Sequence, residues 1–424
     1  MKFAKDFKSP DPVPQEGIDR AIKLMQTGRM YRYNFYAEFH EENPDLSLLG
    51  DENIASEVSK LEYEFSRYLG YKYAVAVNSC GSALFLALKA AGVKHQDKVF
   101  TNGFTFTAVP SSIVHAGGIP VYIECNTNYT IDIEDFKSKI AANPDAKYFI
   151  LSHMRGHISE MDEIKAICDE AGIYLIEDCA HSLGATWDGN HVGHHGKIAC
   201  FSSQSYKMLN SGEGGFLVTN EPREAVYAIL GAGCYENLYK KHIARPFDDD
   251  LFEELKPTVP GYSIRMNNLT AAVIRPQINK LEAKVAAYRK RYDRLVSLLE
   301  SVDRIRIPNP PEKCDRAPSS IQFNLLNLTT KQLDKFLKET AVRGVKIQVF
   351  GRFDNARYFK NWRYSFAETP DLEQTDRIIS FACDLRISLS FDLEDIDSLA
   401  FIVKEVLQNI IDEAEPEKLL VSNA

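Results

Sequence analysis

The chain has 424 residues, of which 45% are hydrophobic and 26% are charged, so it can bury a sizeable core and is not generally disordered. Its length predicts two or three domains. The formal net charge of −9 argues against nucleic acid as a partner. No apolar run approaches the length of a membrane span, and the first ten residues lack the apolar stretch of a signal peptide. We therefore expect no membrane partner and a cytoplasmic location.

The N-terminal region combines polar and apolar residues at helical spacing over residues 15–70. A polar, acidic insertion around residues 36–52 interrupts this pattern and predicts a loop or a dimer arm. We expect an N-terminal arm and helix over residues 1–55. Within it, Arg29, Arg32 and Tyr33 could either contact an acidic substrate or form a helix-end or dimer contact.

Short apolar runs alternate with helical segments from residue 73 onward. The runs lie at residues 73–77, 99–101, 119–123, 148–152, 173–177, 199–202 and 215–219. This alternation is typical of an α/β sheet that is covered by helices on both faces. We expect a large domain over residues 56–265.

The last third of the chain predicts a connector and a second, smaller domain. Residues 266–303 carry one long helical pattern with charges on the outside, which suits a bridging helix. Beyond it, strand-like runs lie at 320–326, 345–350 and 386–391, and helical patterns at 330–342 and 394–412. This order predicts a small C-terminal α+β domain over residues 304–424.

The cysteines and histidines do not form a metal-binding pattern. The eight cysteines are scattered without a C-x-x-C spacing, so we expect reduced thiols in the core. His191, His194 and His195 could form a metal site, but their glycine-rich spacing and the absence of nearby acids or thiols favour a surface loop. We expect no metal.

Three segments could carry chemistry. Asn78–Ala83 lies between a predicted strand and a predicted helix, where free N–H groups could bind an anion, although a tight turn is as plausible. Asp178 directly follows the run at 173–177, at the edge where open α/β sheets bind ligands, but it could also be a helix cap. Lys207 lies among small and polar residues before Gly212, and a lysine becomes a nucleophile when burial or neighbouring charge lowers its pKa.

These segments, taken in order, resemble the DegT/StrS family of pyridoxal-phosphate (PLP)-dependent sugar aminotransferases. The likeness extends over roughly residues 15 to 410 and depends on order and spacing as well as on single motifs. Its motifs are Ser79-Cys-Gly-Ser-Ala, Phe104-Thr-Phe-Thr-Ala, residues 153–161, 176–185 and 201–215, and Gly261-Tyr-Ser-Ile-Arg-Met. The resemblance implies fold type I, which has a large domain with a mostly parallel central sheet and a smaller C-terminal α+β domain.

The resemblance also implies roles in binding the PLP ring. Lys207 would carry the cofactor as a Schiff base and then shuttle a proton. Asp178 would pair with the protonated pyridine nitrogen and keep the ring an electron sink. His181 would contact the ring hydroxyl, and Phe106 would stack on the ring face.

The expected phosphate site contains one departure from the family. Gly81 and Ser82 would hold the phosphate through backbone N–H groups, and the Ser202 hydroxyl would add a bond. Ser263 replaces the asparagine that usually reaches this phosphate from the second subunit, and it is shorter. The resemblance therefore implies a homodimer with shared active sites, in which Ser263 and Arg265 cross over.

Retention of Lys207 favours amino transfer, because some relatives that replace this lysine with histidine are dehydratases. The expected activity is transfer of an amino group from glutamate or glutamine to a nucleotide- or phosphate-linked keto sugar in amino-sugar biosynthesis. A cyclitol aminotransferase or a PLP-dependent keto-sugar dehydratase is the alternative. A non-catalytic PLP-binding regulator is a further alternative, but the acidic chain carries no DNA-binding segment. Gln204 and Ser205 replace the usual His-Pro, so substrate choice could differ.

Overall fold

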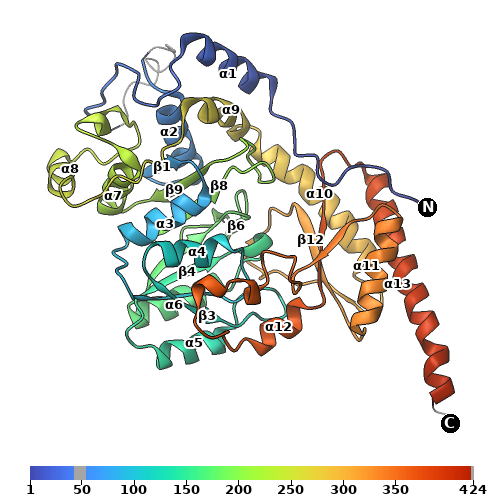
Figure 1. The fold of residues 1–424 in the computed structure, drawn as a ribbon. Helices are drawn as coiled ribbons and strands as arrows, with labels where there is room; N and C mark the ends of the chain where they lie inside the picture. The colour runs from blue at the N-terminus through green and yellow to red at the C-terminus, as the bar shows by residue number, and fades with distance from the viewer. Residues whose placement is uncertain (43–53, 422–424) are drawn as a thin grey trace.

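A seven-stranded sheet organises the first half of the protein. The computed structural model describes residues 1–42 and 54–421 (Figure 1). The strands are β1 (Tyr73–Val77), β2 (Lys98–Asn102), β3 (Ile119–Ile123), β4 (Tyr148–Ser152), β5 (Tyr174–Asp178), β8 (Ile198–Ser202) and β9 (Gly215–Thr219), in the order β1-β9-β8-β5-β4-β2-β3. Strand β9 is antiparallel to both of its neighbours and the remaining pairs are parallel. The expected mostly parallel central sheet is confirmed.

Helices cover both faces of this sheet because its strands are apolar on both sides. In β1, Val75 and Val77 belong to the core beneath α3 (Cys80–Ala90), α4 (Ala108–His115) and α7 (Pro222–Gly233). Ala74 and Ala76 of the same strand face the core of α2 (Glu57–Leu69), α5 (Ile133–Ala142) and α6 (Met161–Ala171). Successive side chains of a strand point to opposite faces, so one apolar run contributes to two cores.

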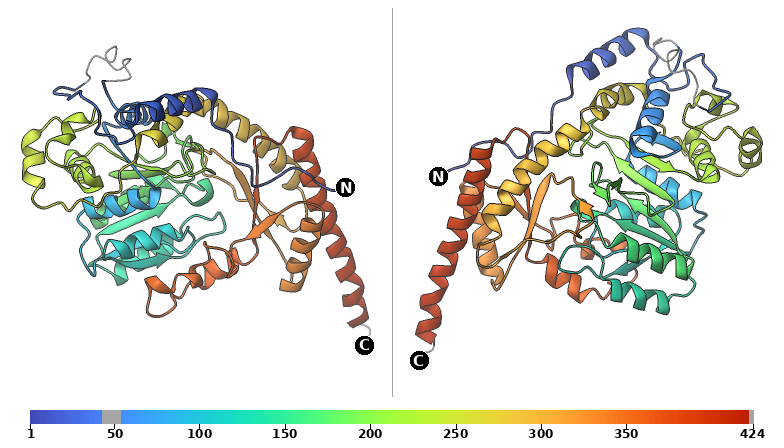
Figure 2. Two further views of the ribbon diagram at one scale, coloured as in Figure 1. Left: turned by 45° about the horizontal axis from the view of Figure 1, so that its top comes forward. Right: turned by 180° about the vertical axis from the view of Figure 1, so that it is seen from behind.

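The expectation of one bridging helix over residues 266–303 is wrong in one respect, because this segment forms two helices. Helix α9 (Asn268–Ile278) packs on α1 (Gln15–Thr27) and α2, and α10 (Leu281–Leu299) continues to the second domain (Figures 1 and 2). The backbone at Lys280 (φ −104°, ψ 0°) leaves helical geometry, and its N–H bonds the carbonyl of Gln277 three residues before it. The apolar spacing continues through this break, so the sequence pattern does not reveal it.

The smaller domain is built on a four-stranded antiparallel sheet with the order β10-β12-β14-β13. Its strands are β10 (Ile305–Arg306), β12 (Ser320–Leu325), β13 (Ile347–Val349) and β14 (Ala382–Arg386), and its helices are α11 (Thr330–Val342), α12 (Glu373–Ile379) and α13 (Leu393–Val421). The strand expected at 386–391 is therefore wrong, because β14 ends at Arg386. The apolar residues that follow, such as Ile387, are buried in irregular chain.

Short elements join these parts. Strands β6 (Thr186–Trp187), β7 (Asn190–His191) and β11 (Cys314–Asp315) form a small third sheet, and α8 (Asp249–Leu255) follows α7. The N-terminal segment before α1 reaches the small domain, where Phe3 and Phe7 pack edge-on against Phe391 (Figure 1). Part of the expected acidic loop or arm, residues 43–53, lies outside the described residues. Among the helices described, none is long and apolar enough to cross a membrane.

Candidate active site

A cavity of about 690 Å³ lies at the carboxyl edge of the large sheet. Residues of the large domain, including Asp178 and Lys207, line one side, and residues of the small domain, including Asp384 and Arg386, line the other. The cavity has the size of a pocket for a cofactor-sized ligand. Its position is where open α/β sheets bind ligands, because the strands end there and successive loops supply polar groups.

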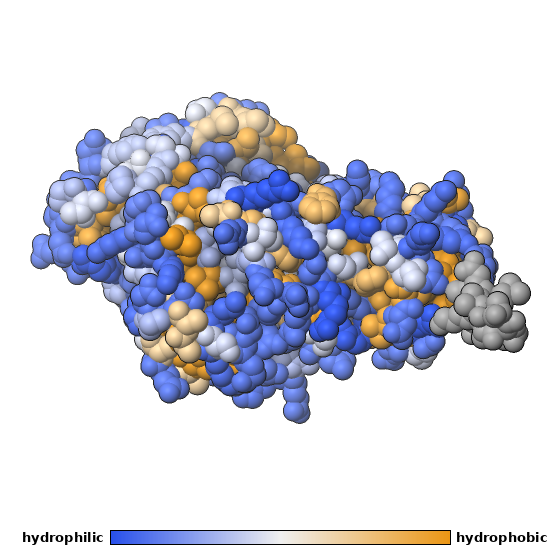
Figure 3. Space-filling model, turned by 60° about the horizontal axis from the view of Figure 1, so that its bottom comes forward, coloured by the Kyte–Doolittle hydropathy of each residue, from blue (hydrophilic) through white to orange (hydrophobic). Residues whose placement is uncertain are grey.

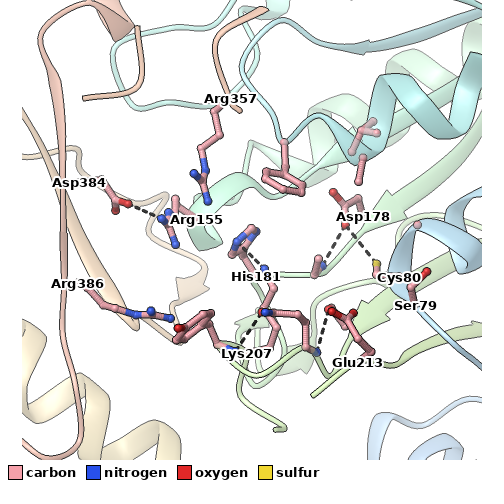
Figure 4. Close-up of a pocket in the computed structure, with 18 of the residues that line it drawn as sticks. Ser79, Cys80, Arg155, Asp178, His181, Lys207, Glu213, Arg357, Asp384 and Arg386 are labelled. Atoms are coloured by element: carbon pink, nitrogen blue, oxygen red, sulfur yellow. Dashed lines mark hydrogen bonds and ion pairs between the residues drawn. The ribbon is translucent and has the colours of Figure 1, made fainter. Parts of the chain in front are cut away.

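Lys207 lies in the loop between β8 and β9 and points into this cavity (Figure 4). Its Nζ is 2.6 Å from Nε2 of His181. Burial and the positive charge of Arg155 lower the pKa of Lys207 from 10.5 to about 7. A large share of the amine is therefore unprotonated at neutral pH, which is the form that attacks a carbonyl carbon.

His181 is held in its neutral form. Burial and the charges of Lys207 and Arg155 keep the pKa of His181 well below its usual range. A neutral imidazole can form a hydrogen bond with the Lys207 amine without placing a second positive charge beside it. The predicted contact between His181 and a ring hydroxyl stays a prediction, and the structure places the residue beside the reactive amine.

Asp178 is the last residue of β5 and is fixed by hydrogen bonds to both carboxylate oxygens. Ser152 Oγ donates to Oδ2 at 2.7 Å, and the N–H of Ala180 donates to Oδ1 at 3.1 Å. The side chain is buried at the cavity wall. A carboxylate held in this way suits a cationic ring nitrogen, so the residues present fit the predicted PLP ring.

The turn before α3 presents free backbone donors to the cavity. Cys80 and Gly81 line the cavity, and no described group accepts from their N–H groups. Ser79 Oγ accepts the N–H of Ser82 at 3.1 Å as a helix cap, so a phosphate could use that amide only by displacing the cap. This arrangement fits a phosphate at the helix N-terminus, with Gly81 better placed than Ser82.

Gly215 allows β9 to approach this turn. A Cβ atom at that position would lie 2.4 Å from the backbone nitrogen of Cys80 and from the carbonyl carbon of Ser79. No side chain fits at such a distance, which explains the glycine at position 215.

Of the remaining predicted cofactor residues, two line the cavity and one does not. Phe106 and Ser202 line the cavity, and Ser202 Oγ accepts the N–H of Gln204 at 3.3 Å. Ser263 does not line the cavity; it is exposed, and its Oγ lies 3.0 Å from the Tyr235 hydroxyl. A contact of Ser263 with a cofactor would therefore require the site of a second subunit, as the resemblance implies.

Two groups suggested by the sequence have other roles. Arg32 is buried with both guanidinium arms on Glu62, at 2.8 and 2.7 Å, and does not line the cavity, so the acidic-substrate interpretation of Arg32 is wrong. His194 contacts the Leu69 carbonyl and His195 contacts Asp162, so these histidines do not converge.

One described group does bring three potential metal ligands within 4.8 Å of one another, namely His153, Glu177 and Cys179. Both oxygens of Glu177 are already engaged, one by His153 Nε2 at 2.9 Å and the other by the N–H of Gly196. Burial raises the pKa of Cys179 well above its usual range, which keeps it a thiol. Two of its members flank Asp178 in the chain, and the backbone N–H of His153 donates to the Asp178 carbonyl at 3.0 Å.

Sequence reasoning missed three arginines that face the cavity, Arg155, Arg357 and Arg386 (Figure 4). They come from the loop after β4 and from two places in the small domain. Arg155 has a positive φ of 55°, an uncommon conformation for a residue with a side chain. The only signal in the sequence was the position of Arg155 in the motif at 153–161.

Comparison with known proteins gives a family match over most of the chain. The model of the DegT/DnrJ/EryC1/StrS aminotransferase family matches residues 51–404. The spore coat polysaccharide biosynthesis protein SpsC of Bacillus subtilis is 33% identical over 227 residues, which are 53% of this chain and 57% of SpsC. GDP-perosamine synthase of Vibrio cholerae is 32% identical over 234 residues, which are 55% of this chain and 59% of that enzyme. The matches thus span less than two thirds of either relative.

Solved structures share the fold over almost the full chain. 3-Amino-5-hydroxybenzoic acid synthase has a TM-score of 0.78 at 24% identity, covering 96% of this chain and 100% of that chain. The PLP form of Spr1654 from Streptococcus pneumoniae has a TM-score of 0.75 at 17% identity, covering 95% and 98%. The predicted fold type I is confirmed.

Proposed function

The chain belongs to the DegT/DnrJ/EryC1/StrS aminotransferase family and is a PLP-dependent enzyme, and from this premise we propose that it transfers an amino group from glutamate or glutamine to a nucleotide- or phosphate-linked keto sugar in amino-sugar biosynthesis. The observation that carries the proposal is a lysine amine, Lys207, with a pKa of about 7 in the same cavity as the fixed carboxylate of Asp178. PLP, when bound, supplies an electron-accepting ring that stabilises negative charge on the substrate carbon.

In this proposal, Lys207 holds the cofactor covalently, and its released amine then carries a proton to and from the reacting carbon. A pKa near 7 suits both tasks, because the amine can accept and release a proton at neutral pH. His181, 2.6 Å away, orients the amine and adds no positive charge. Lys207 is thus the proposed catalytic residue.

The other proposed residues bind and orient the cofactor. Asp178 keeps a proton on the pyridine nitrogen, and Ser152 holds Asp178 in place. The free N–H groups of Cys80 and Gly81, together with Ser202, bind the phosphate at the N-terminus of α3.

The first test follows the two half-reactions of the holoenzyme one at a time, beginning with amino donor alone. Glutamate or glutamine should bleach the visible absorbance of bound PLP, and a nucleotide- or phosphate-linked keto sugar should restore it and yield an amino sugar detectable by mass. Lys207→Ala should abolish both steps, whereas Lys98→Ala, which removes an exposed ion pair with Asp145, should leave them unchanged. Turnover by Lys207→Ala would refute the proposed role of the lysine.

The same assay separates the alternatives. A panel of free, phosphorylated and nucleotide-linked keto sugars and of keto cyclitols, analysed by mass, identifies the acceptor. Loss of water without gain of nitrogen would indicate a dehydratase. Failure of every amino donor to react with a fully loaded protein would favour a regulator.

We also propose that the protein is a homodimer in which Ser263 of each subunit faces the other subunit's cavity. Most of the face in Figure 3 is hydrophilic, with apolar side chains gathered in separate patches. On α1, Ile18, Ile22 and Met25 are exposed at spacings of four and three residues, which places them on one side of the helix. This stripe supports a contact with a second copy.

Sedimentation equilibrium tests the dimer directly. Ile22→Glu should weaken self-association, whereas Val342→Glu on α11, which replaces a still more exposed apolar residue of the small domain, should not. A wild-type protein that sediments only as a monomer would contradict the proposal.

A further inference from the structure

The small-domain side of the cavity carries more positive charge than the described residues neutralise. Arg155, Arg357 and Arg386 all face the cavity, and Asp384 is the one carboxylate on that wall (Figure 4). Asp384 forms an ion pair with Arg155 through Oδ2, and its Oδ1 accepts a hydrogen bond from Gln322 at 2.8 Å. Both oxygens are therefore occupied, and two guanidinium groups remain.

Arg357 has only weak partners for its charge. Its Nη1 lies 3.4 Å from Asn355 Oδ1, and its guanidinium carbon lies 5.3 Å and 5.9 Å from the centres of the Phe106 and Phe350 rings. Its Nε is buried without a hydrogen-bond partner, and no ion pair to Arg357 is found within the described part of the chain. Burying such a group without an anion costs free energy, so an anionic ligand would stabilise it.

The positive charge persists at neutral pH. Burial and the neighbouring Arg155 lower the pKa of Arg357 from 12.5 to about 9, which still leaves the guanidinium protonated. The same charges act on Lys207, since Arg155 and Arg357 both lower its pKa. Arg155 and Arg357 therefore lie close enough to the reactive amine to influence it.

Arg386 is presented to the cavity in a fixed orientation. Its guanidinium carbon lies 3.8 Å from the centre of the Tyr206 ring, and Tyr206 directly precedes Lys207. An aromatic ring beneath a guanidinium fixes the plane of the fork and leaves its N–H edge free for a ligand. No carboxylate of the described residues forms an ion pair with Arg386.

We propose that Arg357 and Arg386, with Arg155 anchored by Asp384 beside them, form a carboxylate-binding site on the small-domain wall of the cavity. The planar fork of an arginine matches the two oxygens of a carboxylate, and two such forks provide more donors than one neutral sugar hydroxyl requires. The proposal rests on the proposed aminotransferase function for the identity of the ligand. The carboxylate belongs either to the amino donor or to an acidic keto sugar.

The test uses ligands that bind without reacting. Calorimetry of the PLP-loaded enzyme with 2-oxoglutarate probes the donor carboxylates. Paired titrations with UDP-glucuronate and UDP-glucose, which differ by one carboxylate, probe an acidic acceptor. Arg357→Leu and Arg386→Leu should each weaken one of these carboxylate-dependent affinities by roughly 30-fold or more, since a buried charge pair is lost.

The controls separate loss of the site from loss of folding. Arg357→Lys keeps the charge without the fork and should recover part of the affinity. Arg352→Leu removes an arginine five residues away that pairs with Asp334, and it should bind both probes like the wild type. Each variant must retain the visible absorbance of bound PLP, which reports an intact cavity.

The outcomes are distinct. Weaker 2-oxoglutarate binding assigns the site to the donor, and loss of a preference for UDP-glucuronate over UDP-glucose assigns it to the acceptor. If wild-type enzyme shows neither affinity, or if PLP-loaded Arg357→Leu and Arg386→Leu retain both, the inference is wrong. If the wild type binds a carboxylate through Arg357 but reacts with no amino donor, the proposed function fails while the binding site stands.

Discussion

The pKa of Lys207 leads to a prediction about the apoenzyme. At a pKa of about 7, half of the Lys207 amine is unprotonated at pH 7, whereas a lysine at 10.5 would have about 0.03% in that form. Lys207 should therefore react with an acylating reagent at pH 7 roughly a thousandfold faster than a lysine with a pKa of 10.5 would. Arg155→Met removes the largest cause after burial, so the titration midpoint should rise above that of the wild type and remain below 10.5.

Trace labelling of the apoenzyme with acetic anhydride over a pH series, read for each lysine by mass spectrometry, measures this midpoint. Lys98, which lies outside the cavity, serves as the reference in the same sample. The same pKa affects stability, because the unfolded chain keeps this proton up to about pH 10.5 and the folded chain only to about 7. The unfolded state thus binds more protons between these values, and the contribution of Lys207 to stability rises with pH across that window. A wild-type midpoint near 10 would refute the reasoning.

Three further changes test the support of the site and of the fold around it. Ser152→Ala removes the 2.7 Å bond to Asp178 and should weaken PLP binding about tenfold, as measured by equilibrium dialysis; unchanged affinity would show that the bond is dispensable. Gly215→Ala places a methyl group about 2.4 Å from the turn before α3 and should cost about 1–3 kcal/mol in urea unfolding with loss of PLP absorbance, whereas normal loading would contradict the close approach. Glu62→Gln leaves the Arg32 charge buried and should cost about 3–5 kcal/mol of unfolding free energy; a cost below 1 kcal/mol would count against this buried pair.

The sheet could be predicted from the sequence because each of its strands is a short apolar run, as at residues 73–77 and 215–219. The division of the bridging segment at Lys280 could not, because the break changes backbone angles and leaves the apolar spacing intact. The last predicted strand was misplaced for a related reason, since Ile387 is buried without belonging to β14. Periodicity reports burial, and burial alone does not fix backbone hydrogen bonding.

Some residues of the candidate site could likewise be predicted from the sequence, and others could not. Lys207 and Asp178 could be found because they follow strands whose carboxyl ends meet at one edge, and because their motifs resemble those of a family. Arg155, Arg357 and Arg386 come from loops and strand ends separated by up to 231 residues, where a single arginine has no periodic signal. Arg32 was considered for an acidic substrate, but its buried partner, Glu62, lies thirty residues away and could not be recognised from the sequence.

The proposed carboxylate site would also couple ligand binding to the chemistry at Lys207. Arg155 and Arg357 both lower the pKa of the amine, so an anion that offsets their charge should raise it. Lys207 would then hold a proton more firmly with substrate bound, when it must take one from the reacting carbon. Repeating the labelling with saturating 2-oxoglutarate distinguishes this effect from shielding, because shielding lowers the rate at every pH whereas coupling moves the midpoint upward. Arg357→Leu should abolish this upward shift of the midpoint. If bound 2-oxoglutarate leaves the midpoint of the wild type unchanged, the arginines bind the ligand without coupling it to the amine.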